Sequence, residues 1–311
     1  MNKKIKVAIC SPSFSSNKIL RKEIKKQFSK VFFNNSGKIL RDKKLYNFLK
    51  NKDVAIVGLE KINSQILNRL PNLKIISKFG VGLNNIDLNI IKKKKIKLSW
   101  TGGVNKRAVS EITLMFILNL LRSSYNLISS VKKGKWNKIP GNELTGKKIG
   151  VLGYGVIGKD LIELLKPFRC NIFVNDITKQ KNHHRKKNLT YCSKGKIFKN
   201  CDVITIHLPL TKKTRNLIGL AQLKKMKKKA ILINTSRGEI IKEKELYRFL
   251  LKNKSFRCAF DVFEKEPPEN KKLLNLNNFI CTPHIASNTD ESILNAGRFS
   301  IKGLIKPNFI K

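Results

Sequence analysis

Three segments of the sequence place a charged or titratable side chain a few residues after a short apolar run. Arg237, Glu266 and His284 occupy these positions. If the runs are parallel strands, the side chains lie near one sheet edge, where open α/β folds bind ligands. A guanidinium is a rigid fork of donors for a carboxylate, and an imidazole titrates nearest neutral pH. The alternatives are a surface or helix-start arginine, a loop carboxylate before Pro267 and a turn or packing histidine.

A glycine pattern lies between an apolar strand and an amphipathic helix, within residues 149–161. Gly153 permits a tight turn, Gly155 lets the backbone approach a pyrophosphate, and Gly158 allows close helix–sheet packing. The bound anion then rests on free amides at the start of the helix. This G-x-G-x-x-G segment predicts a dinucleotide-binding turn.

A carboxylate follows the next expected strand, as the same pattern requires. Asp176 comes after residues 171–175, about 20 residues beyond the glycines. A carboxylate there accepts hydrogen bonds from the adenine-ribose hydroxyls and repels a 2′-phosphate, which favours NAD over NADP. Lys179 leaves NADP open, and a capping or turn aspartate is the structural alternative.

The elements that must position these residues alternate between short β-rich runs and helix-period segments. Such alternation predicts parallel α/β layers. In the first part we expect strands at 7–9, 31–33 and 54–57 and helices at 19–28 and 62–70. A long buried helix is expected over 105–121 and a last helix over 290–305. Between them, the expected strands are 148–152, 172–174, 203–206, 230–233 and 258–260.

Composition favours a globular chain with two domains. The sequence has 311 residues and is 41% hydrophobic, which suits two domains of ordinary size. Its six cysteines form no C-x-x-C pair, so we expect reduced, mostly buried thiols and no metal site. No apolar run approaches the roughly 20 residues of a membrane span, and residues 1–12 lack a signal-peptide core. A cytoplasmic location without membrane association is expected.

The formal charge of +46 has two interpretations. One is binding to nucleic acid or a membrane surface. The other is a lysine-rich and asparagine-rich composition with the lysines on solvated faces. Lysine runs occur all along the chain, without interleaved aromatic residues. We favour the second interpretation and expect no specific nucleic-acid partner.

Five motifs in order resemble those of the D-isomer-specific 2-hydroxyacid dehydrogenases, the family that includes D-3-phosphoglycerate dehydrogenase. They are the glycine turn, the three segments around Arg237, Glu266 and His284, and Phe79–Asp87, which is similar to the family's substrate loop. Residues 100–105 are also similar to the family's entry into its nucleotide domain, and the resemblance covers nearly the whole chain.

The resemblance implies an α/β fold of two Rossmann-like, doubly wound parallel-sheet domains with a cleft between them. Residues 1–103 with 286–311 form the substrate-binding domain, and residues 104–285 form the NAD-binding domain. The implied reaction moves a hydride between NAD(H) and a small D-2-hydroxy acid, with 3-phosphoglycerate as one candidate. The resemblance also implies a homodimer built on the nucleotide domain, to which the helix after Asn105 contributes.

The resemblance also assigns roles to residues. Arg237 binds the substrate carboxylate and polarises the carbonyl, His284 is the general acid/base, and Glu266 is its carboxylate partner. The substrate-binding set is Gly80, Val81, Gly82, Arg237 and His284. The cofactor-binding set is Gly153, Gly155, Val156, Ile157, Gly158, Asp176, His207, Leu208, Pro209, Thr235, Ser236, Arg237, Asp261, His284 and Ala286.

Some positions depart from the family's pattern. Gly102 stands where members usually carry Pro, Asn84 where Asp is common, and Glu239 where a small residue is usual. Gly58 stands where members that oxidise phosphoglycerate commonly have an arginine for the phosphate, so the substrate stays open. We also expect no appended regulatory domain of the kind that some members carry, and no serine feedback. A non-catalytic, cofactor-sensing protein like the corepressors of this fold is the alternative function.

Overall fold

The chain folds into two units in a computed structural model that describes residues 2–178 and 188–307. One, the N-terminal unit, comprises Met1–Asn105 and Asn288–Lys311, and the other, the central unit, comprises Lys106–Ser287. The chain therefore passes from one unit to the other near residue 105 and returns near residue 288. From the sequence, these passages are expected at 103/104 and 285/286.

The N-terminal unit is built on a five-stranded parallel sheet in the order β2-β1-β3-β4-β5. This is one of the two common doubly wound orders. Its strands are β1 (Asn2–Ile9), β2 (Phe28–Phe33), β3 (Val54–Val57), β4 (Ile75–Lys78) and β5 (Lys97–Ser99).

Helices cover both faces of this sheet, because each face is apolar. Two buried clusters, one on each face, hold the layers together. One face carries α3 (Asp42–Leu49), α4 (Ser64–Leu67) and α5 (Leu88–Lys93). The other carries α1 (Pro12–Ser16), α2 (Lys18–Gln27) and α13 (Asp290–Ile305), the returning C-terminal helix.

The central unit contains a seven-stranded parallel sheet in the order β12-β11-β10-β9-β6-β7-β8. Its first strand along the chain, β6, lies between β7 and β9, so the winding reverses at β6/β9, the kind of position where doubly wound folds bind nucleotides. The strands are β6 (Lys148–Leu152), β7 (Asn171–Asn175), β8 (Leu189–Tyr191), β9 (Val203–Ile206), β10 (Ile231–Asn234), β11 (Arg257–Phe260) and β12 (Phe279–Cys281).

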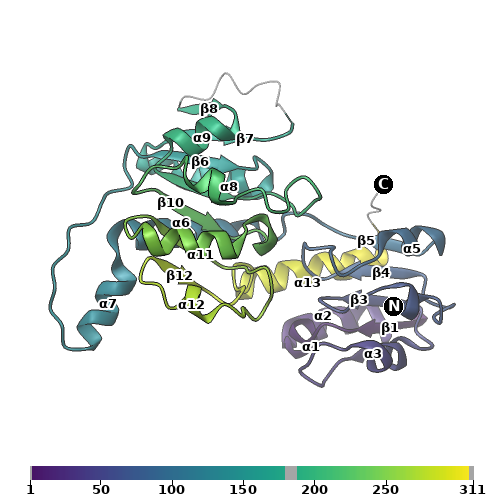
Figure 1. The fold of residues 1–311 in the computed structure, drawn as a ribbon. Coiled ribbons are helices and arrows are strands. Elements are labelled where there is room, and N and C mark those ends of the chain that lie inside the picture. Colours follow the sequence, from purple (N-terminus) through teal and green to yellow (C-terminus); the bar gives the residue numbers. More distant parts are fainter. Residues whose placement is uncertain (1, 179–187, 308–311) are drawn as a thin grey trace. The chain divides into compact units, whose positions relative to one another are not determined.

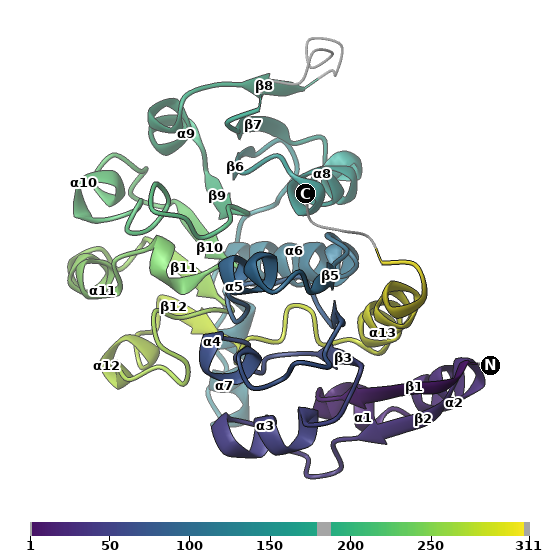
Figure 2. The ribbon, with the colours of Figure 1, turned by 90° about the vertical axis from the view of Figure 1, so that its right-hand side faces the viewer.

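Helices again lie along both faces, as Figure 2 shows. One face carries α6 (Lys106–Arg122) and α8 (Val156–Leu165), with the 3₁₀ turn η1 (Lys166–Phe168). The other carries α9 (Lys194–Asn200), α10 (Leu220–Leu223), the 3₁₀ turn η3 (Gly238–Ile240), α11 (Glu243–Lys252) and α12 (Lys271–Leu274). The helix α7 (Ser124–Lys132) follows α6 and extends away from the sheet (Figure 1).

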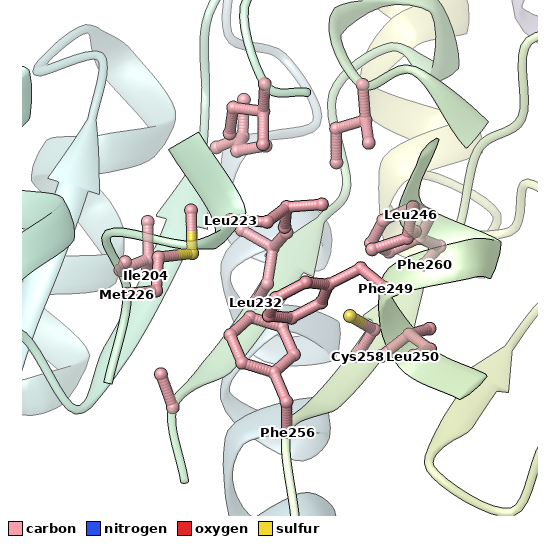
Figure 3. Packing of buried hydrophobic residues seen from close by; sticks show 14 of the residues in the cluster. Ile204, Leu223, Met226, Leu232, Leu246, Phe249, Leu250, Phe256, Cys258 and Phe260 are labelled. Atoms are coloured by element: carbon pink, nitrogen blue, oxygen red, sulfur yellow. The ribbon is translucent and has the colours of Figure 1, made fainter. Parts of the chain in front are cut away.

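The largest core cluster lies under α11, where Figure 3 shows Phe249 of the helix beside Phe256 and Leu232. The two phenylalanine rings meet edge to face, with centroids 5.1 Å apart, a geometry that aromatic pairs prefer. Phe256 and Leu232 are fully buried. This packing fixes β10 and β11, the strands that lead into two of the candidate segments.

The prediction of two parallel-sheet α/β domains is confirmed. Several elements lie where the sequence pattern placed them, including the long helix α6, although Met115 and Leu118 of that helix are exposed. The helix expected over 62–70 is wrong in extent, since only Ser64–Leu67 is helical. Phe28, expected to end a helix, begins β2 instead.

No helix in the described part of the chain is long and apolar enough to cross a membrane. The same described part also contains no group of three His, Cys, Asp or Glu side chains that could hold a metal ion. All six cysteines are free thiols; four are buried, Cys192 is half-buried and Cys281 is exposed.

Candidate active site

The candidate residues of the central unit lie along one edge of its sheet. Because all seven strands are parallel, their carboxyl ends share this edge, and six neighbouring strands each lead into a candidate residue. His284 follows β12, and Asp261 and Glu266 follow β11. Thr235, Ser236 and Arg237 follow β10, and His207, Leu208 and Pro209 follow β9. Gly153 follows β6, and Asp176 follows β7.

His284 and Glu266 are in direct contact. Nδ1 of His284 lies 2.7 Å from Oε2 of Glu266, and both side chains are partly exposed. The amide of Phe263 donates to Oε1 of Glu266 at 3.1 Å, which orients the carboxylate. Because Nδ1 faces the carboxylate, Nε2 is the imidazole nitrogen left to exchange a proton with a ligand.

Asp261 anchors the loop that carries His284. This carboxylate is fully buried and accepts three hydrogen bonds from the loop. The donors are the Thr282 hydroxyl at 2.5 Å and the amides of Ile285 and Ala286, both at 2.8 Å. His284 itself has a φ of +54°, a conformation uncommon for a residue with a side chain. The bonds on either side of it hold the loop in this shape.

Arg237 projects from a turn that Asn234 organises. The buried Asn234 amide donates to the Arg237 carbonyl at 2.9 Å and accepts from the Ser236 amide at 3.1 Å. Thr235 is tied to Thr113 of α6 through their hydroxyls, 3.1 Å apart. Asn234 was not predicted from the sequence; its signal there is an amide side chain at the end of an otherwise apolar strand.

The turn with Arg237 packs directly on the loop with Glu266. A Cβ on Gly238 would lie 1.8 Å from the carbonyl carbon of Phe263, so the two backbones meet where only glycine fits. Glu243 and Glu264 tie the same segments together, since the carboxylate of each accepts from the backbone amide of the other. The structure thus brings the segments of all three catalytic candidates together.

The three glycines of the nucleotide turn have distinct surroundings. A Cβ on Gly153, whose φ is +101°, would lie 2.4 Å from the His207 carbonyl oxygen, and one on Gly158 would lie 2.2 Å from the Gly153 carbonyl oxygen. A Cβ on Gly155 would meet nothing within 4 Å. The backbone at Gly155 is therefore open to a ligand at the start of α8, as a pyrophosphate site requires.

Asp176 lies beside this turn. The amide of Tyr154 donates to Oδ2 of Asp176 at 2.7 Å, and the amide of Thr178 donates to Oδ1 at 2.8 Å. Each oxygen keeps a second lone pair for a ribose hydroxyl. Lys179, the residue that left NADP open, lies outside the described residues.

His207 follows β9 at the point where the winding reverses. Its Nε2 lies 3.0 Å from the Thr205 hydroxyl, and burial lowers the pKa of the imidazole to about 4. The ring is therefore neutral at neutral pH. The neighbouring Leu208 carbonyl accepts a hydrogen bond from the Ser236 hydroxyl, which links the segments after β9 and β10.

In the N-terminal unit, Gly80, Val81 and Gly82 follow β4 directly. Gly80 has a φ of +102°, and no hydrogen bond joins any of the three amides to another described residue. Consecutive free amides in a turn form an anion-binding concavity. The loop can therefore hold an anionic group such as a carboxylate.

Gly58, at the end of the adjacent strand β3, is enclosed by polar partners. Its amide donates to the fully buried Glu60 carboxylate at 2.6 Å. Its carbonyl accepts from the Asn85 amide at 3.0 Å and from the Lys78 ammonium. Burial raises the pKa of the Glu60 carboxyl. The backbone donor at Gly58 is thus already occupied by an acidic side chain.

The sequence and structure match known proteins along most of the chain. The family model "D-isomer specific 2-hydroxyacid dehydrogenase, NAD binding domain" matches residues 114–286. A hydroxypyruvate reductase of Thermotoga maritima is 34% identical over 273 residues, which cover 86% of this chain and 88% of the relative. A D-3-phosphoglycerate dehydrogenase of Methanocaldococcus jannaschii is 36% identical over 83% of this chain, but only 50% of that relative is covered.

Solved structures lead to the same family as the sequence comparisons. A D-lactate dehydrogenase of Aquifex aeolicus, in complex with NAD and lactic acid, has a TM-score of 0.83 at 27% identity, covering 96% of this chain and 95% of the other. A putative family member from Polaromonas has a TM-score of 0.88 at 25% identity, with 97% and 95% covered. The chain belongs to the D-isomer-specific 2-hydroxyacid dehydrogenase family and is an NAD-dependent oxidoreductase that transfers a hydride between NAD(H) and a small D-2-hydroxy acid.

Proposed function

We propose that His284, Glu266 and Arg237 carry out the proton transfer and substrate binding of this reaction. The proposal depends most on the contact between His284 and Glu266. Asp261 holds the His284 loop at the edge of the central sheet that also bears the glycine turn. An imidazole held by a carboxylate can act as a general acid and a general base.

In the reductive direction, the guanidinium of Arg237 binds the carboxylate of a 2-oxo acid and polarises its C2 carbonyl. NADH, when bound at the glycine turn, would supply the hydride for C2. Nε2 of His284 donates the proton that the C2 oxygen takes up, and the imidazole becomes neutral. Glu266 stabilises the imidazolium before this transfer, and in the oxidative direction it stabilises the imidazolium that forms. The free amides of Gly80, Val81 and Gly82 bind the substrate carboxylate.

The residues near β6 and β9, where the winding of the central sheet reverses, fit a dinucleotide cofactor. The open backbone at Gly155 and the amides of Val156 and Ile157 would receive the pyrophosphate, and Asp176 would bind the adenine ribose. The nicotinamide side would be lined by His207, Leu208, Pro209, Thr235 and Asp261. Ser236, Arg237, His284 and Ala286 complete the proposed cofactor-binding set. A carboxylate at position 176 favours NAD over NADP, because it would repel a 2′-phosphate.

We also propose that the substrate carries no phosphate, in contrast to 3-phosphoglycerate. A phosphate favours positively charged groups and free donors. At Gly58 the amide is taken by Glu60, and the Lys78 ammonium is held at the carbonyl. Glyoxylate, hydroxypyruvate and pyruvate fit this chemistry better than phosphohydroxypyruvate.

A substrate panel tests this function. Purified protein is mixed with NADH and with each of the four 2-oxo acids, and NADH oxidation is followed at 340 nm. We expect turnover with an unphosphorylated acid, at a kcat/KM at least about tenfold above that for phosphohydroxypyruvate, which corresponds to about 1.4 kcal/mol. Tight NADH binding without turnover on any acid would contradict the proposal and favour the cofactor-sensing alternative.

The proposed assembly is a homodimer in which α6 and α7 meet a second copy. No residue of α7 is buried, and large apolar side chains are exposed on both α6 and α7, as expected of an interaction surface. We define the α6–α7 patch as Met115, Leu118, Tyr125, Ile128 and Val131. Light scattering should give the dimer mass for the wild type and the monomer mass for Ile128→Lys. The control Leu59→Lys, at a similarly exposed position of the N-terminal unit, should remain dimeric.

We place the protein in the cytoplasm. Six free thiols, of which four are buried, fit a reducing compartment. Fractionation of cells that produce the protein should recover it with cytoplasmic markers, and recovery with the membrane or secreted fraction would contradict this location.

A further inference from the structure

The loop formed by Gly80, Val81 and Gly82 is braced by one aromatic residue. Trp100 follows β5, and β5 pairs with β4 through Ser99 and Ser77. The residue after β5 therefore lies beside the loop after β4. The indole Nε1 of Trp100 donates a hydrogen bond to the Val81 carbonyl at 2.8 Å.

This bond fixes the direction of a neighbouring amide. The Val81 carbonyl and the Gly82 N–H belong to one trans peptide unit, in which the two groups point in opposite directions. When the indole holds the carbonyl, the Gly82 N–H must point away from the indole. That N–H has no partner among the described residues, so it is oriented and available for an anion.

The absence of a side chain at position 102 leaves room for the indole. A Cβ on Gly102 would lie 2.9 Å from Cη2 and 3.3 Å from Cζ2 of Trp100. The backbone φ there is not positive, so space rather than backbone conformation requires glycine. Proline, the residue usual in the family at this place, would press on the ring. Trp100 and Gly102 thus act as a matched pair.

We propose that Trp100 is a positioning residue that aims the Gly82 amide at the carboxylate of the substrate. This inference rests on the proposed function, in which the loop binds that carboxylate. Trp100 does not touch the reacting atoms. Loss of its N–H should therefore weaken 2-oxo acid binding and leave the cofactor and the proton transfer unaffected.

The first test compares Trp100→Phe with the wild type and with Trp136→Phe, the same substitution at the highly exposed second tryptophan. Trp100→Phe should raise KM for the 2-oxo acid about 3- to 10-fold, the worth of one hydrogen bond. It should change kcat less than about twofold and leave the Kd for NADH unchanged, while Trp136→Phe should resemble the wild type. A KM equal to that of the wild type overturns the inference, as does an equal rise in KM and in the Kd for NADH.

The second test uses the matched pair. Gly102→Ala should raise KM in the wild type, because the methyl group displaces the indole, and should have little effect in the Trp100→Phe background, whose smaller ring leaves space. Equal effects in both backgrounds contradict the coupling. If Gly102→Ala only lowered the stability of the protein, its effect would be the same in both backgrounds and would be seen as a lower Tm in thermal unfolding.

A third measurement is independent of turnover. In Trp136→Phe, Trp100 is the only tryptophan, so its emission should change when oxamate, an unreactive 2-oxo acid analogue, binds in the presence of NAD⁺. Oxamate binding without any emission change would overturn the inference. If the wild type reduces a 2-oxo acid and Trp100→Phe behaves identically, only this inference fails. If the wild type reduces none, the proposed function fails, and this inference fails with it.

Discussion

Oε2 of Glu266 lies 2.7 Å from Nδ1 of His284, although the two residues belong to loops after different strands. Parallel neighbours β11 and β12 bring these loops to one edge, and the Phe263 amide fixes the carboxylate from the other side. The pair therefore presents Nε2 of His284 to a ligand, with a negative charge behind the ring.

Glu266→Gln should reduce turnover without changing cofactor binding. A charge-assisted hydrogen bond contributes about 1.5–3 kcal/mol, so kcat for 2-oxo acid reduction should fall about 10- to 100-fold. The Kd for NADH, measured by fluorescence, should stay at the wild-type value. Glu269→Gln is the control, since Glu269 is an exposed surface partner of Lys265. A kcat within twofold of the wild type for Glu266→Gln would remove Glu266 from the mechanism.

Asp261→Asn should destabilise the loop that carries His284. The substitution replaces one carboxylate oxygen, which accepts hydrogen bonds, by an NH₂ group. This NH₂ group would face the Thr282 hydroxyl or the backbone amides of Ile285 and Ala286, which are themselves donors. Such a mismatch in a buried site costs about 1–3 kcal/mol, or about 2–10 °C in Tm for a unit of this size. Calorimetry and kcat should both decline. Asp290→Asn, at an exposed position, is the control; equal Tm values for the two variants would refute the anchoring role.

Gly155→Ala and Gly158→Ala should separate binding from folding. At Gly155 the new methyl group meets no protein atom, so Tm should hold within about 1 °C while the Kd for NADH rises about tenfold or more, about 1.4 kcal/mol. At Gly158 the methyl group would lie 2.2 Å from a backbone oxygen, so stability should drop by about 1–3 kcal/mol. The reverse pattern would mean that the turn does not face the pyrophosphate.

His207 should make the central unit sensitive to acid. Its pKa falls from 6.5 in the unfolded chain to about 4 in the folded protein because of burial. Between these values the unfolded state binds more protons, so stability is full above pH 6.5 and declines as the pH falls towards 4. The decline should reach about 2 kcal/mol at pH 5. Urea unfolding at pH 7.5 and pH 5 should show a smaller difference for His207→Gln; an equal difference would contradict this role.

Much of the fold could be predicted because most residues of the buried strands are apolar. Val54–Val57, Lys148–Leu152 and Val203–Ile206 are strands with the bounds expected. The pattern did not reveal β4, whose carboxyl end buries Ser77 and Lys78, or the three-residue strands β5 and β8. The helix expected over 62–70 is shorter, because Asn63 is its N-cap and Asn68 its C-cap, so that only Ser64–Leu67 is helical.

The residues of the candidate site also fall into two groups, those that the sequence pattern predicts and those that it does not. Arg237, Glu266 and His284 were selected as candidates because charged or titratable side chains are unusual just after apolar strands. Gly238 and Trp100 were missed as functional residues because their roles depend on partners that only the folded chain brings near. The Trp100 partner, for example, is 19 residues away. Asn234 was missed although its partners, Ser236 and Arg237, are two and three residues away. Sequence patterns report residue types and periods, whereas such contacts are set by packing.

The proposed role of His284 is decided by His284→Ala, with NADH oxidation on the best 2-oxo acid and NADH binding measured on the same sample. We expect kcat to fall about 10²- to 10⁴-fold, because the general acid is lost, while the Kd for NADH stays within a few-fold of the wild type. Retained turnover in His284→Ala would contradict this role.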